Sequence, residues 1–351
     1  MTHKFCAPGA VDVDWNMVVD RLKQARTVAI FTHMRPDPDA LGSQVAAGLA
    51  LRKFGITPTL VDLSPVPPAL EFLYPVQTAL ERISLTLEKP HFPPREFDLI
   101  LIVDTCTKAQ LERAWPYLES RGSKILVLDH HRTRDAIGSL IVADVLAAAC
   151  TEMVADLIAA LGVGLDQDIS TALLAGLAAD TGWFRFDSVT PRSYGLAAQL
   201  VAAGAAPARI YQNLAQRESR AKLALIQHAL RNLTWLGDGR VAVMELSGAD
   251  FAATGAASFE TDGLTDYPMM VATAVIVALL SEAPDGVIRV NLRSKHSIDV
   301  SLIAAGFGGG GHVRAAGCRL PGPLPAAREI LSARLLEALG QTPAWDAAAR
   351  G

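Results

Sequence analysis

Residues 97–105 read FDLILIVDT, and residues 124–131 read KILVLDHH. Each stretch is a nearly continuous run of apolar residues that ends on carboxylate or imidazole side chains. Continuous apolar runs are typical of strands that are covered on both faces, as in a parallel sheet. The two stretches therefore predict buried strands with polar side chains at their carboxyl ends.

Similar strands alternate with helices through the first half of the chain. Thr27–His33 (TVAIFTH) and Thr57–Leu63 are predicted strands, and Asp39–Phe54 between them is a predicted helix that stops before Gly55. Three further helices are predicted, over Thr151–Leu161, Gln167–Asp180 and Pro191–Ala203. This alternation predicts a doubly wound α/β domain with a mostly parallel sheet.

The chain of 351 residues is long enough for two domains, because single cores rarely grow beyond about 250–300 residues. We expect a first domain over residues 1–204, a helical connector over residues 205–231 and a smaller α/β domain over residues 232–351. Strands in the second domain are predicted at Arg240–Leu246, Met269–Leu280 and Val287–Arg293, with a closing helix at Ala326–Leu339.

Half of the residues are hydrophobic and 19% are charged, and 32 Lys and Arg face 36 Asp and Glu, which gives a formal net charge of −4. This composition excludes a disordered chain and disfavours a binder of long nucleic acid, which needs a basic surface. The start, MTHKFCAPGAVDVDW, lacks the apolar core of a signal peptide, and the apolar runs fall short of the roughly 20 residues that span a bilayer. We expect a soluble, cytoplasmic protein that does not bind membranes.

Four cysteines, Cys6, Cys106, Cys150 and Cys318, are far apart and form no Cys-x-x-Cys pair. A disulfide framework is not expected in a chain of this size, and the ligand pattern of a structural zinc site is lacking. Reduced thiols agree with a cytosolic location.

Acidic and histidine side chains follow the predicted strands or close a predicted helix. They are His33, Asp37 and Asp39 in HMRPDPDALGS, Asp104 after LILIV, Asp129, His130 and His131 after KILVL, and Asp180 in LAADTGWF. In open α/β sheets the carboxyl ends of parallel strands converge on one crevice, so His33, Asp104 and residues 129–131 should meet there. Because Asp37 precedes Pro38, its backbone should be extended, which directs Asp37 and Asp39 to the same side.

Packed carboxylates repel one another, and a pair of divalent cations would remove that repulsion. Oxygen and imidazole ligands without thiolates suit Mn²⁺ or Mg²⁺, and two such ions about 3.5–4 Å apart form a clamp that hydrolyses phosphoesters. Singly, Asp104 could be a turn residue, Asp39 a helix N-cap and Asp180 the end of a helix. The combination in this order favours the metal site.

The second half contains GFGGGGHVRAAG over residues 306–317. One interpretation is a glycine loop whose backbone N–H groups face an anion, with His312 as a further donor and Arg293 as a phosphate-binding fork. The alternative is a flexible turn beside an exposed arginine. For Trp183, Phe184 and Phe186, core packing is the favoured interpretation and base stacking the alternative.

The ordered motifs HMRPDPDA, VDT, DHH and DTGWF, followed by NLRS and GGGGH, span His33 to Gly317. Together they resemble the DHH phosphoesterase superfamily with a DHHA1 type of second domain. Within it, the chain is most similar to the bacterial bifunctional oligoribonuclease (nanoRNase) and 3′-phosphoadenosine-5′-phosphate phosphatase group.

This resemblance implies two Mn²⁺ ions, for which Mg²⁺ or Co²⁺ could substitute, in the cleft between two domains. One ion would be held by His33, Asp37, Asp104 and Asp180, and the other by Asp39, Asp104, His130 and Asp180, so that Asp104 and Asp180 bridge. His131 would contact the scissile phosphate and Asp129 would orient the histidines. The nucleotide would be held by Arg293, Ser294, Gly309, Gly310, Gly311 and His312. The family pattern commonly has a small residue where this chain has Pro38, whose ring fixes φ near −65°.

The implied activity is hydrolysis of very short RNA oligonucleotides to mononucleotides and of 3′-phosphoadenosine-5′-phosphate to AMP. The alternatives are a phosphodiesterase of cyclic or linear dinucleotides and, from another class, a non-catalytic nucleotide sensor. A RecJ-type DNA exonuclease needs further domains, and pyrophosphatases of the superfamily lack the GGGGH loop. The oligomeric state is left open, a homodimer included.

Overall fold

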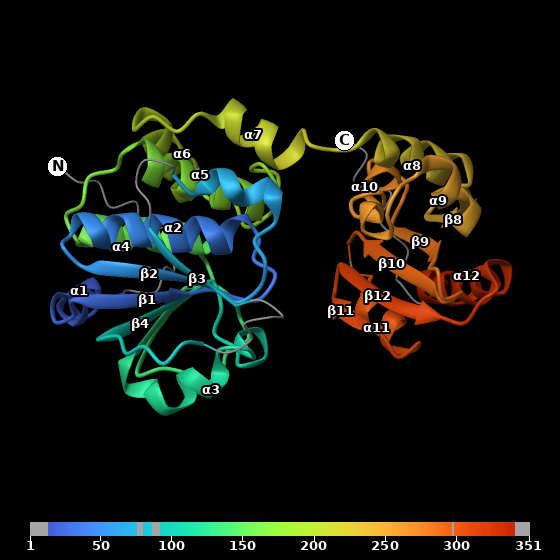
Figure 1. Ribbon diagram of the computed structural model, residues 1–351. Coiled ribbons are helices and arrows are strands. Elements are labelled where there is room, and N and C mark those ends of the chain that lie inside the picture. The colour runs from blue at the N-terminus through green and yellow to red at the C-terminus, as the bar shows by residue number, and fades with distance from the viewer. Residues whose placement is uncertain (1–12, 76–79, 86–91, 297, 341–351) are drawn as a thin grey trace. The chain divides into compact units, whose positions relative to one another are not determined.

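The computed structural model describes residues 13–75, 80–85, 92–296 and 298–340. The chain forms two compact units, Met1–Arg217 and Glu218–Gly351, whose elements are labelled in Figure 1. The division falls inside the stretch for which the sequence predicts a helical connector. Helix α7 (Pro207–Ala215) packs on elements of the first unit and α8 (Arg220–Arg231) on elements of the second.

Six parallel strands form the sheet of the first unit, in the order β3-β2-β1-β4-β5-β6. They are β1 Thr27–Phe31, β2 Thr57–Asp62, β3 Glu81–Ser84, β4 Leu99–Val103, β5 Ile125–Asp129 and β6 Leu140–Ala143. The winding direction reverses between β1 and β4, which is the point where doubly wound sheets open a crevice. The predicted α/β class is confirmed.

Helices cover both faces of this sheet because alternate strand residues point to opposite sides. Val28 and Ile30 of β1 belong to one apolar core, and Ala29 and Phe31 to another. The first core includes side chains of α1 (Trp15–Lys23), α2 (Pro38–Lys53), α4 (Cys150–Ala160) and α5 (Gln167–Asp180). The second includes side chains of η2 (Ala109–Leu111) and α3 (Trp115–Leu118). Figure 1 shows α3 on the face opposite α2. Also in this unit are η1 (Pro68–Leu73), η3 (Glu119–Lys124) and α6 (Pro191–Ala202).

The second unit has a mixed sheet of six strands in the order β11-β12-β10-β9-β8-β7. They are β7 Thr234–Leu236, β8 Val241–Leu246, β9 Ile276–Glu282, β10 Ile288–Ser294, β11 Gly310–His312 and β12 Ala315–Leu320. Only β8 and β9 pair in parallel among these described strands. Side chains of α11 (Val300–Ala305) and α12 (Leu324–Gly340) belong to one core, and those of α8 and α9 (Gly248–Thr254) to the other. Two short turns, η4 (Ser258–Thr261) and α10 (Asp266–Met269), precede β9.

The structure bears on two predictions from the sequence, one about membrane-spanning helices and one about the cysteines. In the part of the chain that is described, no helix is both long and apolar enough to cross a bilayer. Cys106, Cys150 and Cys318 are buried free thiols, whereas Cys6 and most of the N-terminal stretch lie outside the described residues. A cytoplasmic location stays a prediction.

Candidate metal-binding active site

Three adjacent strands of the first sheet end in the predicted polar residues. His33 follows β1 by two positions, Asp104 directly follows β4, and Asp129 is the last residue of β5. Because β1, β4 and β5 are parallel neighbours, their carboxyl ends share one edge of the sheet. The structure thus brings these side chains together at the reversal of winding, as the sequence predicts.

Two helices supply the other carboxylates. Asp37 is the N-cap of α2, and its Oδ1 accepts hydrogen bonds of 2.9 Å from the backbone N–H groups of Asp39 and Ala40. Pro38 occupies the first helical position, where its fixed φ suits the helix and its missing N–H costs nothing. Pro38 between the two aspartates is therefore compatible with the backbone at the start of α2. Asp180 is the last residue of α5.

Close packing of α2 against α5 brings these carboxylates to the same place. A Cβ at Gly176 of α5 would lie 2.7 Å from Oδ1 of Asp39 and 2.6 Å from a methyl group of Thr151. A Cβ at Gly42 of α2 would collide with the backbone carbonyl of Ala172. Glycine inside a helix costs about 1 kcal/mol relative to alanine, so both positions have a packing reason. Neither glycine is among the predicted site residues, although a glycine inside a predicted helix is a detectable signal.

One group of potential ligands gathers around His33. Its Nε2 lies 3.4 Å from Oδ2 of Asp104 and 3.9 Å from Oδ2 of Asp37. One ligand atom from each of these three residues lies within 4.8 Å of the others. Three of the four residues that the family resemblance assigns to the first ion are therefore together.

A second group gathers around His130. Its Nε2 lies 3.4 Å from Oδ2 of Asp180 and 3.8 Å from Oδ2 of Asp39, and these three residues also have ligand atoms within 4.8 Å of one another. The same Nε2 lies 3.4 Å from Oδ1 of Asp104. Asp104 thus presents one oxygen to each group.

Unpaired buried atoms in this cluster fit a cation. Asp104 is 1% exposed, and neither its Oδ1 nor Nε2 of His130 has a hydrogen-bond partner among the described residues. Leaving a buried polar atom unpaired costs about 1–3 kcal/mol. The backbone of Asp104 is also in the left-handed region, with φ of 62°, a strain that proteins retain mainly at functional sites. Imidazole nitrogens and carboxylate oxygens without thiolate suit a hard or intermediate divalent ion.

The imidazoles and Asp104 shift one another's titration. Burial would lower the pKa of His33, but Asp104 and Asp37 outweigh burial and raise this pKa to about 9. Burial opposes protonation of His130 too, yet its carboxylate neighbours, Asp104 first, raise its pKa to about 10. Burial would raise the pKa of Asp104, but the two imidazoles lower it.

Asp39 and Asp180 have raised pKa values, because their surroundings disfavour the ionised carboxylates. Complete burial, followed by repulsion from Asp104 and Asp180, raises the pKa of Asp39 well above its ordinary value. Burial and the charges of Asp104 and Asp37 raise the pKa of Asp180 to about 7. A divalent cation among these oxygens would favour the ionised form of both groups.

Each histidine is held through Nδ1. The contacts are 3.0 Å from His33 to the carbonyl of Met34, 3.3 Å from His130 to the carbonyl of Ala147, and 2.8 Å from His131 to Oδ1 of Asp129. Fixing Nδ1 in this way orients the ring and presents Nε2, as is usual for metal-binding or catalytic histidines. The Asp129 contact also raises the pKa of His131.

The residues predicted in the second unit lie at the paired ends of β10, β11 and β12. Arg293 is half-buried on β10, and the buried Ser294 hydroxyl donates to the carbonyls of Ile298 and Val313, at 2.7 and 3.3 Å. The glycine run is partly strand, because Gly310–His312 forms β11 rather than a loop throughout. The side chain of His312 is outside the described part of the structure.

Close strand packing explains two of these glycines. A Cβ at Gly311, where φ is 146°, would lie 2.5 Å from the carbonyl oxygen of Ala315, and one at Gly309 would collide with the carbonyl of Gly317. A Cβ at Gly310 would have no atom of the described residues within 4 Å beyond its chain neighbours. The pairing of β11 with β12 therefore requires Gly309 and Gly311, and Gly310 has no such packing reason.

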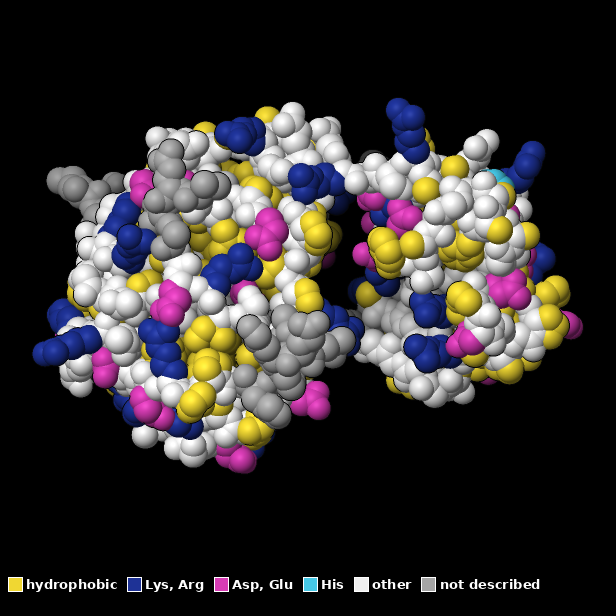
Figure 2. Space-filling model, in the orientation of Figure 1, with side chains coloured by type: hydrophobic (Ala, Val, Ile, Leu, Met, Phe, Trp, Pro, Cys, Tyr) yellow, Lys and Arg dark blue, Asp and Glu magenta, His cyan; other side chains and the backbone are white. Residues whose placement is uncertain are grey.

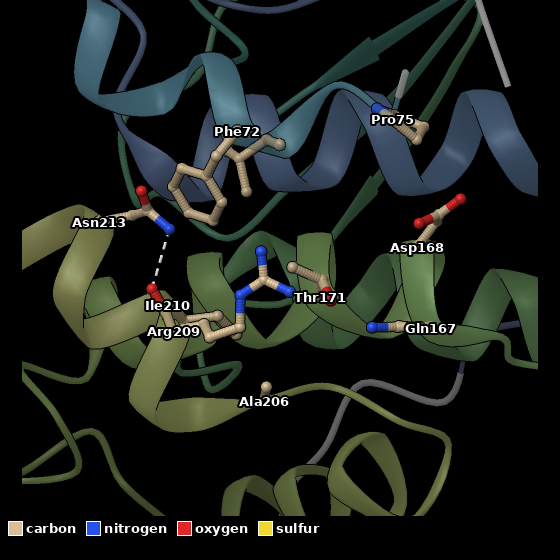
Figure 3. A pocket seen from close by; sticks show the side chains of 10 residues that line it. Phe72, Pro75, Gln167, Asp168, Thr171, Ala206, Arg209, Ile210 and Asn213 are labelled. Carbon is tan, nitrogen blue, oxygen red and sulfur yellow. Dashed lines mark hydrogen bonds between the residues drawn. The ribbon is translucent and has the colours of Figure 1, made fainter. Parts of the chain in front are cut away.

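The aromatic residues after Asp180 divide between core and surface. Trp183 and Phe184 are half-buried against the first core, whereas Phe186 is 54% exposed. A hollow of about 170 Å³, shown in Figure 3, lies elsewhere, beside Phe72, Gln167, Asp168 and Arg209. Thr171 of α5 also lines the hollow and Asp180 is the last residue of this helix, so about 13 Å of helix separates the hollow from Asp180.

Known families match both units. The DHH family, N-terminal domain, matches residues 27–177, and the DHHA1 domain matches residues 240–340. The bifunctional oligoribonuclease and PAP phosphatase NrnA of Thermus thermophilus is 32% identical over 301 residues, which cover 84% of each chain. The chain belongs to the DHH family. The predicted resemblance is confirmed.

Two further proteins are similar to this one over most of the chain. The protein of Bacillus subtilis with the same name is 24% identical over 298 residues, covering 84% of this chain and 89% of that protein. A crystal structure of an exopolyphosphatase-related protein from Bacteroides fragilis has a TM-score of 0.83 at 19% identity and covers 95% of this chain and 98% of that one. At this identity the likeness supports the fold alone.

Proposed function

We propose that the chain is a metal-dependent phosphoesterase that hydrolyses very short RNA oligonucleotides to mononucleotides and 3′-phosphoadenosine-5′-phosphate to AMP. The observation that carries the proposal is Asp104, whose two oxygens lie 3.4 Å from the Nε2 atoms of His33 and His130. The names of the relatives in Thermus thermophilus and Bacillus subtilis support the two substrates.

The residues present fit two divalent cations, which we assign as Mn²⁺ with Mg²⁺ or Co²⁺ as substitutes. His33 and Asp37 would hold one ion, Asp39 and His130 the other, and Asp104 and Asp180 would bridge. When bound, the two ions supply charge stabilisation to a phosphoryl group and activate water at neutral pH.

His131 is the proposed contact to the scissile phosphate. Its side chain is 49% exposed, whereas that of His130 is 13% exposed, so it is the histidine of the pair that a substrate can reach. Asp129 accepts a 2.8 Å hydrogen bond from Nδ1 and raises the pKa of the ring. A protonated His131 would place a fixed positive donor against the phosphate during bond cleavage.

The second unit would select the nucleotide. We propose that Arg293, His312 and the backbone N–H groups around Gly309, Gly310 and Gly311 bind substrate phosphates, with Ser294 supporting them. On the face shown in Figure 2, Lys and Arg side chains are scattered among acidic and apolar ones. This distribution and the net charge of −4 agree with a short substrate.

The decisive experiment is timed hydrolysis of labelled two- to seven-nucleotide RNAs and DNAs with Mn²⁺, beside cyclic dinucleotides and 3′-phosphoadenosine-5′-phosphate. We expect mononucleotides from the short RNAs and AMP from the last substrate. Faster turnover of cyclic dinucleotides would move the assignment to a dinucleotide phosphodiesterase. Negligible turnover of every substrate at full metal occupancy would favour a nucleotide sensor.

Chelation tests the metal requirement separately. Exhaustive treatment with a chelator should abolish hydrolysis, and Mn²⁺ should restore it more fully than Mg²⁺ or Co²⁺. Metal content of the restored protein should approach two ions per chain. Activity that survives complete metal removal would contradict the proposed site.

A further inference from the structure

A charged network outside the ligand cluster centres on Arg192, the second residue of α6. Its guanidinium lies 3.2 Å from Oδ2 of Asp144, 3.7 Å from Oε2 of Glu152 and 2.7 Å from Oδ2 of Asp156. The side chains of Asp144 and Glu152 are 5% and 1% exposed. Buried carboxylates are costly without a partner, so one arginine side chain compensates two of them.

These two carboxylates hold the loop between β6 and α4. Oδ1 of Asp144 accepts a 3.0 Å hydrogen bond from the N–H of Leu146, and its backbone carbonyl accepts one of 3.1 Å from the N–H of Ala147. Oε2 of Glu152 accepts a 3.1 Å bond from the N–H of Ala148. Residues 144–148 are thus held by Asp144 and Glu152, two of the three carboxylate residues that Arg192 pairs with.

Glu152 is also tied to α6 directly. The buried hydroxyl of Ser193 donates a 2.7 Å hydrogen bond to Oε1 of Glu152. The first turn of α6 therefore contacts both oxygens of Glu152, one through Ser193 and one through Arg192. This double contact leaves the carboxylate little freedom to rotate.

The loop ends where two ligand side chains are held. Its Ala147 carbonyl lies 3.3 Å from Nδ1 of His130. Directly after it, the first N–H groups of α4 donate to the buried carboxylate of Asp39, at 2.6 Å from Cys150 and 3.0 Å from Thr151. Both residues belong to the group around His130, whereas His33 is held by the carbonyl of its own neighbour, Met34.

We propose that Arg192 is a positioning residue for one of the two metal sites, the one formed by Asp39, His130 and Asp180. Through Asp144 and Glu152 it fixes the loop that orients the His130 ring and the Asp39 carboxylate. The site formed by His33, Asp37 and Asp104 does not depend on this loop to orient its histidine. The inference rests on the proposed function, because it concerns affinity for the ions assigned there.

Arginine suits this role because its planar guanidinium can serve two carboxylates at fixed angles. Lysine keeps the charge that the buried carboxylates need, but it concentrates that charge at one flexible point. Arg192→Lys should therefore fold while loosening the loop, which makes it a sharper test than a neutral substitution. Asp156→Asn is the matched control. Asp156 also pairs with Arg192, but its side chain is about half exposed, unlike those of Asp144 and Glu152.

The measurement is Mn²⁺ titration of the full-length chain by calorimetry and electron paramagnetic resonance. Losing a direct outer partner of a ligand usually weakens metal binding by about 10–100-fold. Because Arg192 acts on His130 and Asp39 through the loop, we expect Arg192→Lys to weaken one of the two ions by about 10-fold, at the lower end of that range, and to leave the other within about threefold. Asp156→Asn should change neither affinity by more than about threefold. Unchanged affinities in Arg192→Lys, or equal weakening of both ions, would overturn the proposal.

A second readout needs no metal. In ¹⁵N-histidine-labelled, metal-free protein, the Nδ1 proton of His130 should exchange with solvent at least about tenfold faster in Arg192→Lys, whereas that of His33 should not change. If Arg192→Lys fails to fold, Asp144→Asn tests the same link, because asparagine can still accept from the Leu146 N–H but loses the ion pair. Equal exchange at His130 in wild type and variant would refute the link. Absence of Mn²⁺ binding by the wild type would instead refute the proposed function.

Discussion

Oδ1 of Asp104 and Nε2 of His130 lie 3.4 Å apart, both buried and both without a hydrogen-bond partner among the described residues. The other oxygen of Asp104 has the same separation from Nε2 of His33. One carboxylate thus lies between two imidazoles, one from the loop after β1 and one from the loop after β5. A bridging ligand between two cations needs this arrangement of donor atoms.

Asp104→Asn should abolish hydrolysis while the protein stays folded. Asparagine keeps the size of the side chain but removes the negative charge between two cations, so both the affinity for metal and the rate should fall. We expect kcat/KM to drop by at least about 1,000-fold, or roughly 4 kcal/mol. Kinetics on a dinucleotide, metal analysis and a thermal melt measure the three effects. Activity within tenfold of wild type would contradict the two-metal assignment. The control is Asp168→Asn, which makes the same change near the start of α5, at the other end of the helix from Asp180.

Gly176→Ala should disturb the site through packing alone. The added methyl would lie 2.7 Å from Oδ1 of Asp39 and 2.9 Å from its Cα, so α2 and α5 would have to separate. We expect about 1–3 kcal/mol of lost stability, typical of an overpacked core, together with weaker metal binding. Denaturant unfolding and Mn²⁺ titration test this.

Gly340→Ala is the control for that change. Among the described residues, no atom beyond its chain neighbours and the nearby backbone of its own helix lies within 4 Å of a Cβ at Gly340, at the end of α12. Its stability should be unchanged or higher by up to about 1 kcal/mol, because alanine favours the helix. If Gly176→Ala behaves like this control, close packing of the two helices does not position Asp39.

Arg293→Ala should weaken substrate use without loss of metal. Arg293 lies near the end of β10 beside the glycine run, and losing a charged hydrogen bond to phosphate should lower kcat/KM by about 10–1,000-fold, or roughly 1.4–4 kcal/mol. Arg289→Ala is matched, because Arg289 is exposed four positions earlier on the same strand and its side chain points to the same face. Equal kinetics of the two variants would show that the substrate is held elsewhere.

Stability of the metal-free protein should fall as pH rises. His33 and His130 have pKa values near 9 and 10 in the folded chain, above the ordinary value of about 6.5 in the unfolded chain. A raised pKa stabilises the folded state fully below about pH 6.5 and loses that contribution as pH rises through the folded value. The raised pKa of Asp180, near 7, acts in the same direction, and its contribution is lost as pH rises toward neutrality. We expect the free energy of unfolding to decrease steadily between pH 6.5 and 10, measured by unfolding in a chelator.

Saturating Mn²⁺ should reverse this trend between pH 6.5 and 8. Metal ligands must lose their protons, so metal affinity, and with it the stability of the loaded protein, should increase with pH in that range. Replacing His33 by Gln should flatten the fall in the metal-free protein. A metal-free protein whose stability rises steadily from pH 6.5 to 10 would contradict the pKa shifts of this cluster.

Part of the site could be predicted because Asp104, Asp129 and His130 stand at the ends of their own strands. FDLILIVDT and KILVLDHH carry both the apolar run that makes a buried strand and the polar residue at its end. The strand order then places those ends together, and the α/β class requires that result. The helical connector predicted over 205–231 is a different case, because its two helices, α7 and α8, pack in different units. Composition carries no information about which core a helix joins.

The sequence by itself determined the α/β class, the parallel sheet of the first unit and the identity of the polar residues at the strand ends, because these follow from periodicity and from residues adjacent in the chain. Only the tertiary structure decided which carboxylate lies beside which imidazole. That pairing depends on contacts between distant segments: Gly176 lets α5 approach Asp39, and Arg192 holds Glu152 and the loop before α4. Such contacts arise when helices pack on a sheet in three dimensions. No local sequence pattern and no fixed spacing along the chain predicts which distant residues they join.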